Sequence, residues 1–179
     1  MNKYVLLDRD GTLIVHIHHL IEPEKVALKD GTIEGLRKLA HAGYRFGVIT
    51  NQSVIERGLA TREVVDSVNE KMAQLLMKSG VFLDFVFVCP HISATSCTCR
   101  KPMTALGEQA ILEFEIDVDQ SYMVGDRASD IEFGATLGLR TILIHSNSSQ
   151  ICKPDLKAKN ILDCSRQILA RLGKSNDSN

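Results

Sequence analysis

Apolar residues along this chain gather in short runs that are separated by polar and glycine-containing segments. Runs of about five apolar residues bounded by turn residues are typical of buried β-strands. On that basis we expect strands at residues 4–8, 44–49, 84–88, 121–124 and 140–144. Between these runs the apolar positions recur with the spacing of one face of an α-helix. The expected helices are residues 33–40, 64–76, 105–113 and 131–137.

The alternation of strands with helices predicts an α/β fold built on a doubly wound parallel sheet. A weaker pattern near the C-terminus predicts an edge strand at 160–163 and a final helix at 165–172. A chain of 179 residues suits a single hydrophobic core, so we expect one domain over residues 1–173. The Ser/Asn-rich end at 174–179 has little to bury and is expected to form a flexible tail.

Composition and charge argue against several classes of function. Hydrophobic residues make up 44% of the chain and charged residues 24%, which is ordinary for a soluble globular protein. Proteins that bind nucleic acid usually carry an excess of positive charge, whereas this chain has a formal net charge of -1. No run approaches the roughly 18 apolar residues of a membrane span, and no signal-like segment follows Met1. We therefore expect a cytoplasmic monomer with no nucleic-acid or membrane partner.

The most informative polar segment is Asp8-Arg9-Asp10-Gly11-Thr12, directly after the first apolar run. A strand presents residues two positions apart on the same side, so the carboxyl groups of Asp8 and Asp10 are expected to lie close together. Gly11 lets the backbone turn sharply and leaves room for a ligand. Two neighbouring acids become useful when they bind a divalent cation, or when one is a nucleophile and the other a general acid. The alternative is a simple turn at a strand end.

Three further apolar runs also end in chemically capable residues. Thr50-Asn51-Gln52-Ser53 follows the second expected strand, and Gly125-Asp126-Arg127 follows the fourth, with Asp130 one helical turn later. Arg100-Lys101 comes after the third strand, at the end of a cysteine-rich loop. In an open parallel sheet the ligand crevice lies at the carboxyl ends of the strands. These segments are therefore expected to converge on one site with the two acids of the first motif.

The cysteine-rich loop carries four soft metal ligands, namely Cys89, His91, Cys97 and Cys99. Zinc is bound tetrahedrally by such a Cys3His set, and its role is structural when protein fills all four positions. A bound zinc would fix the loop that presents Arg100 and Lys101. The alternatives are reduced thiols without a ligand, or a disulfide, which is unusual in the cytoplasm. Cys152 and Cys164 lie far from this loop in sequence and are expected to be ordinary thiols.

Together these segments resemble the haloacid dehalogenase (HAD) superfamily of phosphotransferases over residues 3–145. The resemblance rests on Asp-x-Asp-Gly-Thr at 8–12, a strand-ending Thr50, Lys101 and Gly-Asp-x-x-x-Asp at 125–130, in that order. Within the superfamily, Thr50-Asn51-Gln52-Ser53 with Arg57-Gly58 and the cysteine loop are similar to the D,D-heptose 1,7-bisphosphate phosphatases. The histidinol-phosphate phosphatases are related to that group and carry a similar cysteine loop.

The resemblance implies Mg2+-dependent phosphoryl transfer through a covalent intermediate. Asp8 would attack phosphorus and become an aspartyl-phosphate. Asp10 would first protonate the leaving oxygen and then take a proton from the attacking water. Magnesium would be held by the Asp8 carboxylate, the Asp10 backbone carbonyl and Asp126.

Other residues are assigned around the transferred phosphate by the same resemblance. The Thr50 hydroxyl would hold phosphoryl oxygens, Lys101 would neutralise charge, and Asp130 would orient Lys101 or the metal-bound waters. The residues implied in substrate recognition are Asn51, Gln52, Ser53, Arg57, Arg100 and Arg127.

The segment at 13–29 is too short for a cap domain, so we expect a flap beside an open pocket suited to small phosphorylated metabolites. In the related proteins this segment lies along the substrate, which makes His16 and His19 candidate substrate-binding residues. A metal site would need convergent histidines, whereas His18 and His19 would point in different directions in an extended chain. Solvated loop histidines are the simpler interpretation.

The resemblance implies removal of the 7-phosphate of D-glycero-D-manno-heptose 1,7-bisphosphate, within the synthesis of ADP- or GDP-heptose for lipopolysaccharide and other surface glycans. The same chemistry on histidinol phosphate or another small phosphomonoester is the alternative. A third hypothesis is a phosphate-accepting receiver module, which also combines a parallel sheet, an Asp, Mg2+ and a Lys. Such a module needs no acid two residues after its acceptor, so Asp10 favours turnover.

Overall fold

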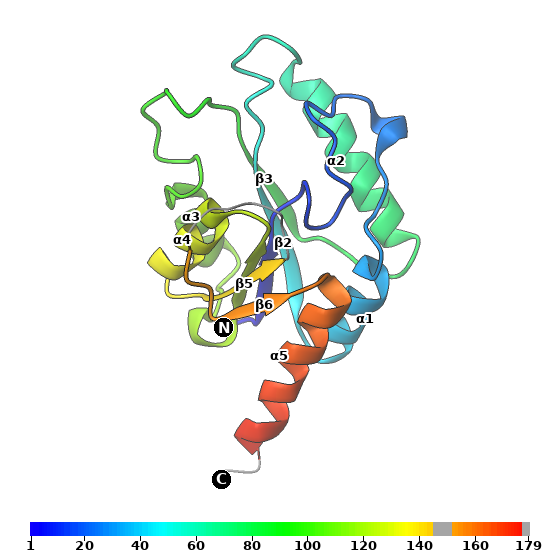
Figure 1. Ribbon diagram of the computed structural model, residues 1–179, viewed down its shortest axis with the longest axis vertical. Helices are drawn as coiled ribbons and strands as arrows, with labels where there is room; N and C mark the ends of the chain where they lie inside the picture. The colour runs from blue at the N-terminus through cyan, green and yellow to red at the C-terminus, as the bar shows by residue number, and fades with distance from the viewer. Residues whose placement is uncertain (145–151, 177–179) are drawn as a thin grey trace.

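The computed structural model describes residues 1–144 and 152–176, with side chains up to residue 172. Its centre is a six-stranded sheet in the order β3-β2-β1-β4-β5-β6 (Figure 1). Every neighbouring pair is parallel. The strands are β1 Tyr4–Leu7, β2 Arg45–Asn51, β3 Phe85–Cys89, β4 Tyr122–Gly125, β5 Arg140–Ile144 and β6 Leu156–Ala158. The order reverses beside β1, and the doubly wound parallel sheet expected from the sequence is confirmed.

Helices cover both faces of this sheet (Figure 1). They are α1 Thr32–His41, α2 Arg62–Met77, α3 Ala105–Glu113, α4 Ala128–Thr136 and α5 Ile161–Asn176, with short turns η1 Pro23–Lys25 and η2 Val118–Gln120. The cluster of buried residues on one face draws on α1, α2 and α5. The cluster on the other face draws on α3 and α4.

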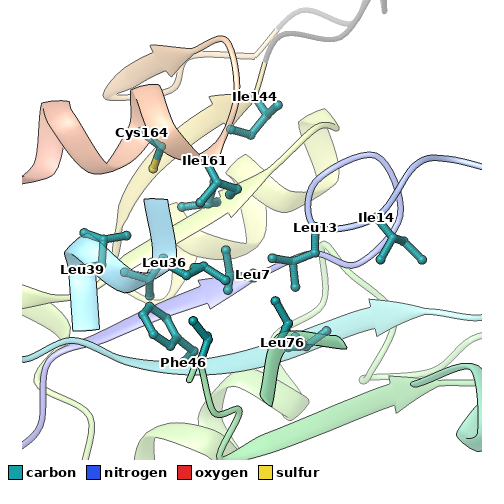
Figure 2. Packing of buried hydrophobic residues seen from close by; sticks show 14 of the residues in the cluster. Leu7, Leu13, Ile14, Leu36, Leu39, Phe46, Leu76, Ile144, Ile161 and Cys164 are labelled. Atoms are coloured by element: carbon teal, nitrogen blue, oxygen red, sulfur yellow. The ribbon is translucent and has the colours of Figure 1, made fainter. Parts of the chain in front are cut away.

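Strand β1 shows why the sheet needs helices on both sides. Val5 and Leu7 belong to the cluster with α1, α2 and α5, whereas Tyr4 and Leu6 belong to the opposite cluster. All four side chains are fully buried, as expected for the centre of a parallel sheet. Figure 2 shows Leu7 among apolar side chains of the first cluster. This packing fixes the end of β1, where the first motif begins.

The C-terminal elements differ from the sequence prediction. The edge strand is Leu156–Ala158, paired with β5, and residues 161–163 are instead the start of the last helix, directly after Asn160. The reason is a helix cap, because the Asn160 side chain accepts a hydrogen bond from the backbone N–H of Asp163 at 2.9 Å. Helix α5 also continues to Asn176, so residues 174–176 are helical rather than part of the expected tail. The rest of that tail lies outside the described residues.

The segment at 13–29 forms a short flap, as expected. An isolated bridge joins Ile14 to Leu28, and the backbone N–H of Lys29 donates to the Leu13 carbonyl at 3.0 Å. The prediction that His18 and His19 point apart is wrong, because their rings stack with centroids 3.8 Å apart. The chain is not extended there, since His19 adopts a positive φ of 52°. Among the described helices, none has the length and apolar character needed to cross a membrane.

Candidate active site

The motif segments meet at the carboxyl edge of the sheet. Asp8 directly follows β1, and its backbone N–H donates to the Val124 carbonyl of β4 at 2.9 Å. A cleft of about 440 Å³ opens above this edge. Every predicted substrate-recognition residue lines the cleft: Asn51, Gln52, Ser53, Arg57, Arg100, Arg127, His16 and His19. Asp8, Asp10, Lys101 and Asp130 line it too.

Lys101 is the central cation of the site. Its Nζ donates to Asp8 Oδ1 at 2.7 Å and to the Ile49 carbonyl at 2.6 Å, and it pairs with Asp130 Oδ1 at 2.7 Å. The side chain is almost completely buried. Burial alone would lower the pKa of Lys101, but Asp130 and Asp8 outweigh burial and hold that pKa above its ordinary value. Lys101 is therefore a permanent positive charge beside the first motif.

If they were all ionised, the acids around Lys101 would carry more negative charge than one ammonium group neutralises. Burial raises the pKa of Asp8 to about 7, with Asp130 and Asp10 adding to the rise and Lys101 opposing it. Burial, followed by the charge of Asp130, also raises the pKa of Asp126. A further cation at this position would let these acids ionise. The electrostatics therefore favour a divalent metal.

The geometry of the same acids fits magnesium. Carboxyl oxygens of Asp8, Asp126 and Asp130 lie within 4.8 Å of one another. Asp126 Oδ1 is buried and has no hydrogen-bond partner in the described part of the chain. A Cβ on Gly11 would lie 2.3 Å from Asp126 Oδ2, and Gly11 has a positive φ of 81°, so glycine is required there. Oxygen donors of this kind suit Mg2+.

Asp10 lies outside this group of acids and is held from two sides. Its Oδ2 accepts hydrogen bonds from Arg9 Nε at 3.0 Å and from Gln52 Nε2 at 2.8 Å. Gln52 Nε2 also donates to Thr50 Oγ1 at 2.8 Å, and the Thr50 side chain is buried. Arg9 continues to Asn69 on α2, where Nη1 donates to Asn69 Oδ1 at 2.8 Å.

Asp130 joins the start of α4 to the lysine. Its Oδ2 accepts a hydrogen bond from the backbone N–H of Arg127 at 3.0 Å, which caps the helix, while its Oδ1 pairs with Lys101. A Cβ on Gly125 would lie 2.3 Å from the Asp130 side chain, so that side chain fills the space beside the strand. The Arg127 side chain is largely exposed at the rim of the cleft.

The cysteine loop places its four predicted ligands together. The ligand atoms of Cys89, His91, Cys97 and Cys99 lie within 4.8 Å of one another. Cys99 Sγ is 3.1 Å from Cys89 Sγ and 3.2 Å from His91 Nδ1. All of these thiols are free, which argues against the disulfide alternative. Burial, together with the hydrogen bond shared with Cys99, raises the pKa of Cys89 to about 12. The donor set and its spacing are compatible with zinc.

The cysteine loop is tied to the substrate-facing residues by direct contacts. Arg100 Nη1 donates to the His91 carbonyl at 2.8 Å. Asn51 and Lys101 exchange two hydrogen bonds, one from Asn51 Nδ2 to the Lys101 carbonyl and one from the Lys101 N–H to Asn51 Oδ1. Glu56 accepts hydrogen bonds from the Ile92 backbone and from Thr95 Oγ1. The loop after β2 and the cysteine loop therefore form one rim of the cleft.

Sequence reasoning missed four residues that contribute to this arrangement: Arg9, Asn69, Glu56 and Lys29. Lys29 Nζ donates to the Gly11 carbonyl at 2.5 Å, which ties the end of the flap to the first motif. A signal existed only for Arg9, a basic residue between two motif acids, and for Asn69, a polar residue on the apolar face of the expected helix 64–76. Nothing in the local sequence marks Glu56 or Lys29.

Comparisons with known proteins agree with this geometry. A HAD-hydrolase-like family profile matches residues 98–163. D-glycero-beta-D-manno-heptose-1,7-bisphosphate 7-phosphatase of Haemophilus influenzae is 39% identical over 140 residues, covering 75% of this chain and 76% of that protein. The histidine biosynthesis bifunctional protein HisB of Campylobacter jejuni is 34% identical over 141 residues, which cover 77% of this chain but 40% of that protein.

Solved structures give the same picture of the fold. D,D-heptose 1,7-bisphosphate phosphatase from B. bronchiseptica, complexed with magnesium and phosphate, superposes with a TM-score of 0.85 at 23% identity, covering 94% of this chain and 99% of that one. The corresponding phosphatase from Burkholderia thailandensis has a TM-score of 0.70 at 27% identity, with coverages of 94% and 99%.

Fold and site together define a phosphatase of the HAD class, with an Asp-x-Asp motif at the carboxyl edge of a parallel sheet. The resemblance inferred from the sequence motifs is confirmed by these relatives. The chain belongs to the family of the D-glycero-beta-D-manno-heptose-1,7-bisphosphate 7-phosphatases.

Proposed function

We propose that this protein removes the 7-phosphate of D-glycero-D-manno-heptose 1,7-bisphosphate and leaves the 1-phosphate for later nucleotide activation. The observation that carries the proposal is the meeting of Asp8, Asp10 and Lys101 in one cleft, in a chain 39% identical to an enzyme named for this reaction. The product would feed the synthesis of ADP- or GDP-heptose. We also propose that the protein acts in the cytoplasm as a monomer, and light scattering of the purified protein tests the monomeric state.

Asp8 and Asp10 divide the reaction between them. An Asp8 carboxylate oxygen attacks the phosphorus of the 7-phosphate, the bond from phosphorus to the sugar oxygen breaks, and Asp10 gives that oxygen a proton. Asp10 then takes a proton from a water molecule that attacks the aspartyl-phosphate. The bond between phosphorus and Asp8 breaks, which releases inorganic phosphate and regenerates the Asp8 carboxylate.

The surrounding residues prepare the phosphoryl group for transfer. Lys101 neutralises charge on Asp8 and on the phosphoryl oxygens, and Thr50 and the neighbouring backbone N–H groups hold those oxygens. Asp8, the Asp10 carbonyl and Asp126 would hold Mg2+, with Asp130 orienting Lys101 or the waters of the ion. Magnesium bound there supplies positive charge that offsets repulsion between the ester and Asp8.

Recognition of the rest of the substrate falls to the cationic and polar residues of the cleft. Arg57, Arg100 and Arg127 lie at its rim, where a second phosphate of the substrate would meet positive charge. The remaining proposed contacts are Asn51, Gln52, Ser53, His16 and His19. Zinc held by the cysteine loop would fix Arg100 through the bond from Arg100 to the His91 carbonyl.

A substrate panel with magnesium tests the proposal. We expect the heptose 1,7-bisphosphate to give a kcat/KM at least about tenfold above that of histidinol phosphate, which equals about 1.4 kcal/mol of transition-state discrimination. Phosphate release and the position of the remaining phosphate are measured on the purified enzyme, with Asp8→Asn as the inactive control. A panel of sugar and amino-alcohol phosphates that yields no phosphate with wild-type enzyme refutes the phosphatase activity.

Histidinol phosphate is the second candidate substrate. It is favoured by the 34% identity to the HisB protein of Campylobacter jejuni. The ligand spacing of the cysteine loop is also similar to that of the histidinol-phosphate phosphatases. A preference for histidinol phosphate of about tenfold or more in the same panel would replace the heptose assignment while leaving the chemistry of Asp8 and Asp10 intact.

A further inference from the structure

A buried arginine lies between the two motif acids and is not used by the proposed chemistry. The Arg9 side chain is 1% exposed and is among the largest fully buried side chains of the described residues. Burying a guanidinium is costly unless its charge is paired and its N–H groups find acceptors. Arg9 must therefore have partners that offset the free-energy cost of its burial.

Those partners are Asp10 on one side and helix α2 on the other. Arg9 Nε and Nη2 both lie 3.0 Å from Asp10 Oδ2, and Nη2 lies 3.3 Å from Asp10 Oδ1. The third nitrogen, Nη1, donates to Asn69 Oδ1 at 2.8 Å. Asn69 is itself 5% exposed. The guanidinium is thus a rigid bridge from the packed face of α2 to the carboxyl group of Asp10.

We propose that Arg9, braced by Asn69, is a positioning residue that fixes the Asp10 carboxyl group for proton transfer. This inference rests on the proposed function, because it assumes that Asp10 is the acid and base of the reaction. Arg9 is among the residues that line the cleft, but each of its three side-chain nitrogens already contacts Asp10 or Asn69. It acts through Asp10.

The arrangement explains how one carboxyl group can serve both half-reactions. After Asp10 gives its proton to the leaving sugar oxygen, it carries a negative charge that must stay in place until water attacks. Arg9 and Gln52 donate to that carboxylate from two different strand ends, so it is held in one orientation between the steps. Well-oriented groups of this kind contribute strongly to rate, and small displacements are costly.

A double-mutant cycle tests whether Arg9 works through Asp10. In the wild-type background, Arg9→Met is expected to lower kcat by about 100-fold while KM changes by less than about threefold. In the Asp10→Asn background the same substitution is expected to lower kcat by less than about twofold, because the group it positions is already disabled. Arg9→Lys keeps the charge but not the fork, and it should recover only part of the loss.

A second variant covers the case in which Arg9→Met yields no folded protein. Asn69→Leu is similar in size, leaves the motif intact and is expected to lower kcat by about tenfold through loss of the brace. Val68→Ala is the matched control, because Val68 is a buried neighbour on the same helix that belongs to the apolar cluster. It should lower the melting temperature without changing kcat.

An aryl phosphate separates the half-reactions. p-Nitrophenyl phosphate has a good leaving group, so its first step needs little help from a general acid, whereas hydrolysis of the aspartyl-phosphate still needs the base. The Arg9 and Asn69 variants are expected to release a burst of nitrophenolate and to accumulate phosphorylated enzyme. A variant that is merely less stable would show a reduced active fraction but no burst.

The outcomes distinguish the two levels of the proposal. If Asp10→Asn is slow but Arg9→Met costs the same factor in both backgrounds, the positioning role of Arg9 is refuted and the assignment of Asp10 stands. If Asp10→Asn keeps full activity, the acid–base assignment fails and the inference about Arg9 fails with it. If the folded Asn69→Leu variant keeps the wild-type kcat, the proposal that Asn69 holds Arg9 in position is refuted.

Discussion

The two clusters of candidate metal ligands in this protein are built in different ways. Asp8, Asp126 and Asp130 come from segments more than a hundred residues apart and are brought together by β1, β4 and α4. Cys89 is the last residue of β3, and His91, Cys97 and Cys99 follow it on one continuous loop. The packed sheet therefore determines where the acids lie. The cysteine loop, in contrast, contains no helix or strand after it departs from β3.

The comparison suggests which site depends on its metal. We expect the carboxylates to keep their places without an ion, because β1 is buried on both faces and Lys101 joins Asp8 to Asp130. The cysteine loop is held by hydrogen bonds to Glu56 and Asn51 and, in our proposal, by zinc. Magnesium would then serve the chemistry, and zinc the shape of the cleft. The following predictions test that difference from the largest effect to the smallest.

Replacement of the nucleophile should have the largest effect of all. Asp8→Asn is expected to lower kcat by at least about 10⁴-fold, since no covalent intermediate can form. The fold should be retained, because the substitution conserves size and removes a buried acid. Phosphate release and circular dichroism measure the two outcomes. Substantial turnover by a folded Asp8→Asn variant would contradict the assignment of the nucleophile.

Replacement of the acid–base residue should lower kcat less than replacement of the nucleophile, and it should also allow phosphorylated enzyme to accumulate. Asp10→Asn is expected to lower kcat by about 10²- to 10⁴-fold. Phosphorylated enzyme should accumulate with an aryl phosphate, because hydrolysis of the intermediate loses its base. Acid quenching followed by mass spectrometry detects the added phosphoryl group on Asp8. Equal loss of both half-reactions, with no trapped intermediate, would argue that Asp10 has another role.

Disruption of the cysteine loop should give a smaller loss of activity and a larger change in metal content. Cys97→Ser is expected to lose zinc, to melt at a lower temperature and to lower kcat/KM by about tenfold, because Arg100 is no longer held. Zinc is measured by elemental analysis and stability by thermal melting. Cys152→Ser is the matched control, since Cys152 lies outside the cluster. Wild-type protein purified without chelators that contains no zinc would remove the structural role.

The smallest predicted effect concerns stability and pH without magnesium. Burial raises the pKa of Asp8 from its ordinary 3.8 to about 7 in the folded protein. A raised carboxyl pKa contributes stability that is fully present below the unfolded value and is lost as pH rises through about 7. Asn is neutral throughout, so the melting-temperature advantage of Asp8→Asn over wild type should grow from about pH 5 to about pH 8. A constant difference would indicate that Asp8 is already ionised at low pH.

The sequence predicted the parts of the molecule that depend on local pattern. The placement of Asp8 and Thr50 at the carboxyl ends of β1 and β2 followed from apolar runs, and the cysteine cluster followed from the number and spacing of its ligands together with the family resemblance. The last strand and helix were misplaced because Asn160 was assigned to the strand rather than to the cap of the helix, while the three residues that pair with β5 form a strand too short to stand out in the apolar pattern. The burial of Arg9 was not predicted: its position between two motif acids was a signal, but arginine is usually exposed and its partner Asn69 is sixty residues away.

An ammonium group has three hydrogens, and the Lys101 ammonium group already has three partners, namely Asp8, Asp130 and the Ile49 carbonyl. An incoming ester can therefore gain a hydrogen bond from Lys101 only by exchange, taking over the place that one of these oxygens occupies. If Asp8 is the group that yields, the arrival of substrate releases the nucleophile from its partner at the moment it is needed. Without substrate, the nucleophilic oxygen of Asp8 would then stay hydrogen-bonded to Lys101, and it would become free when a phosphate ester binds.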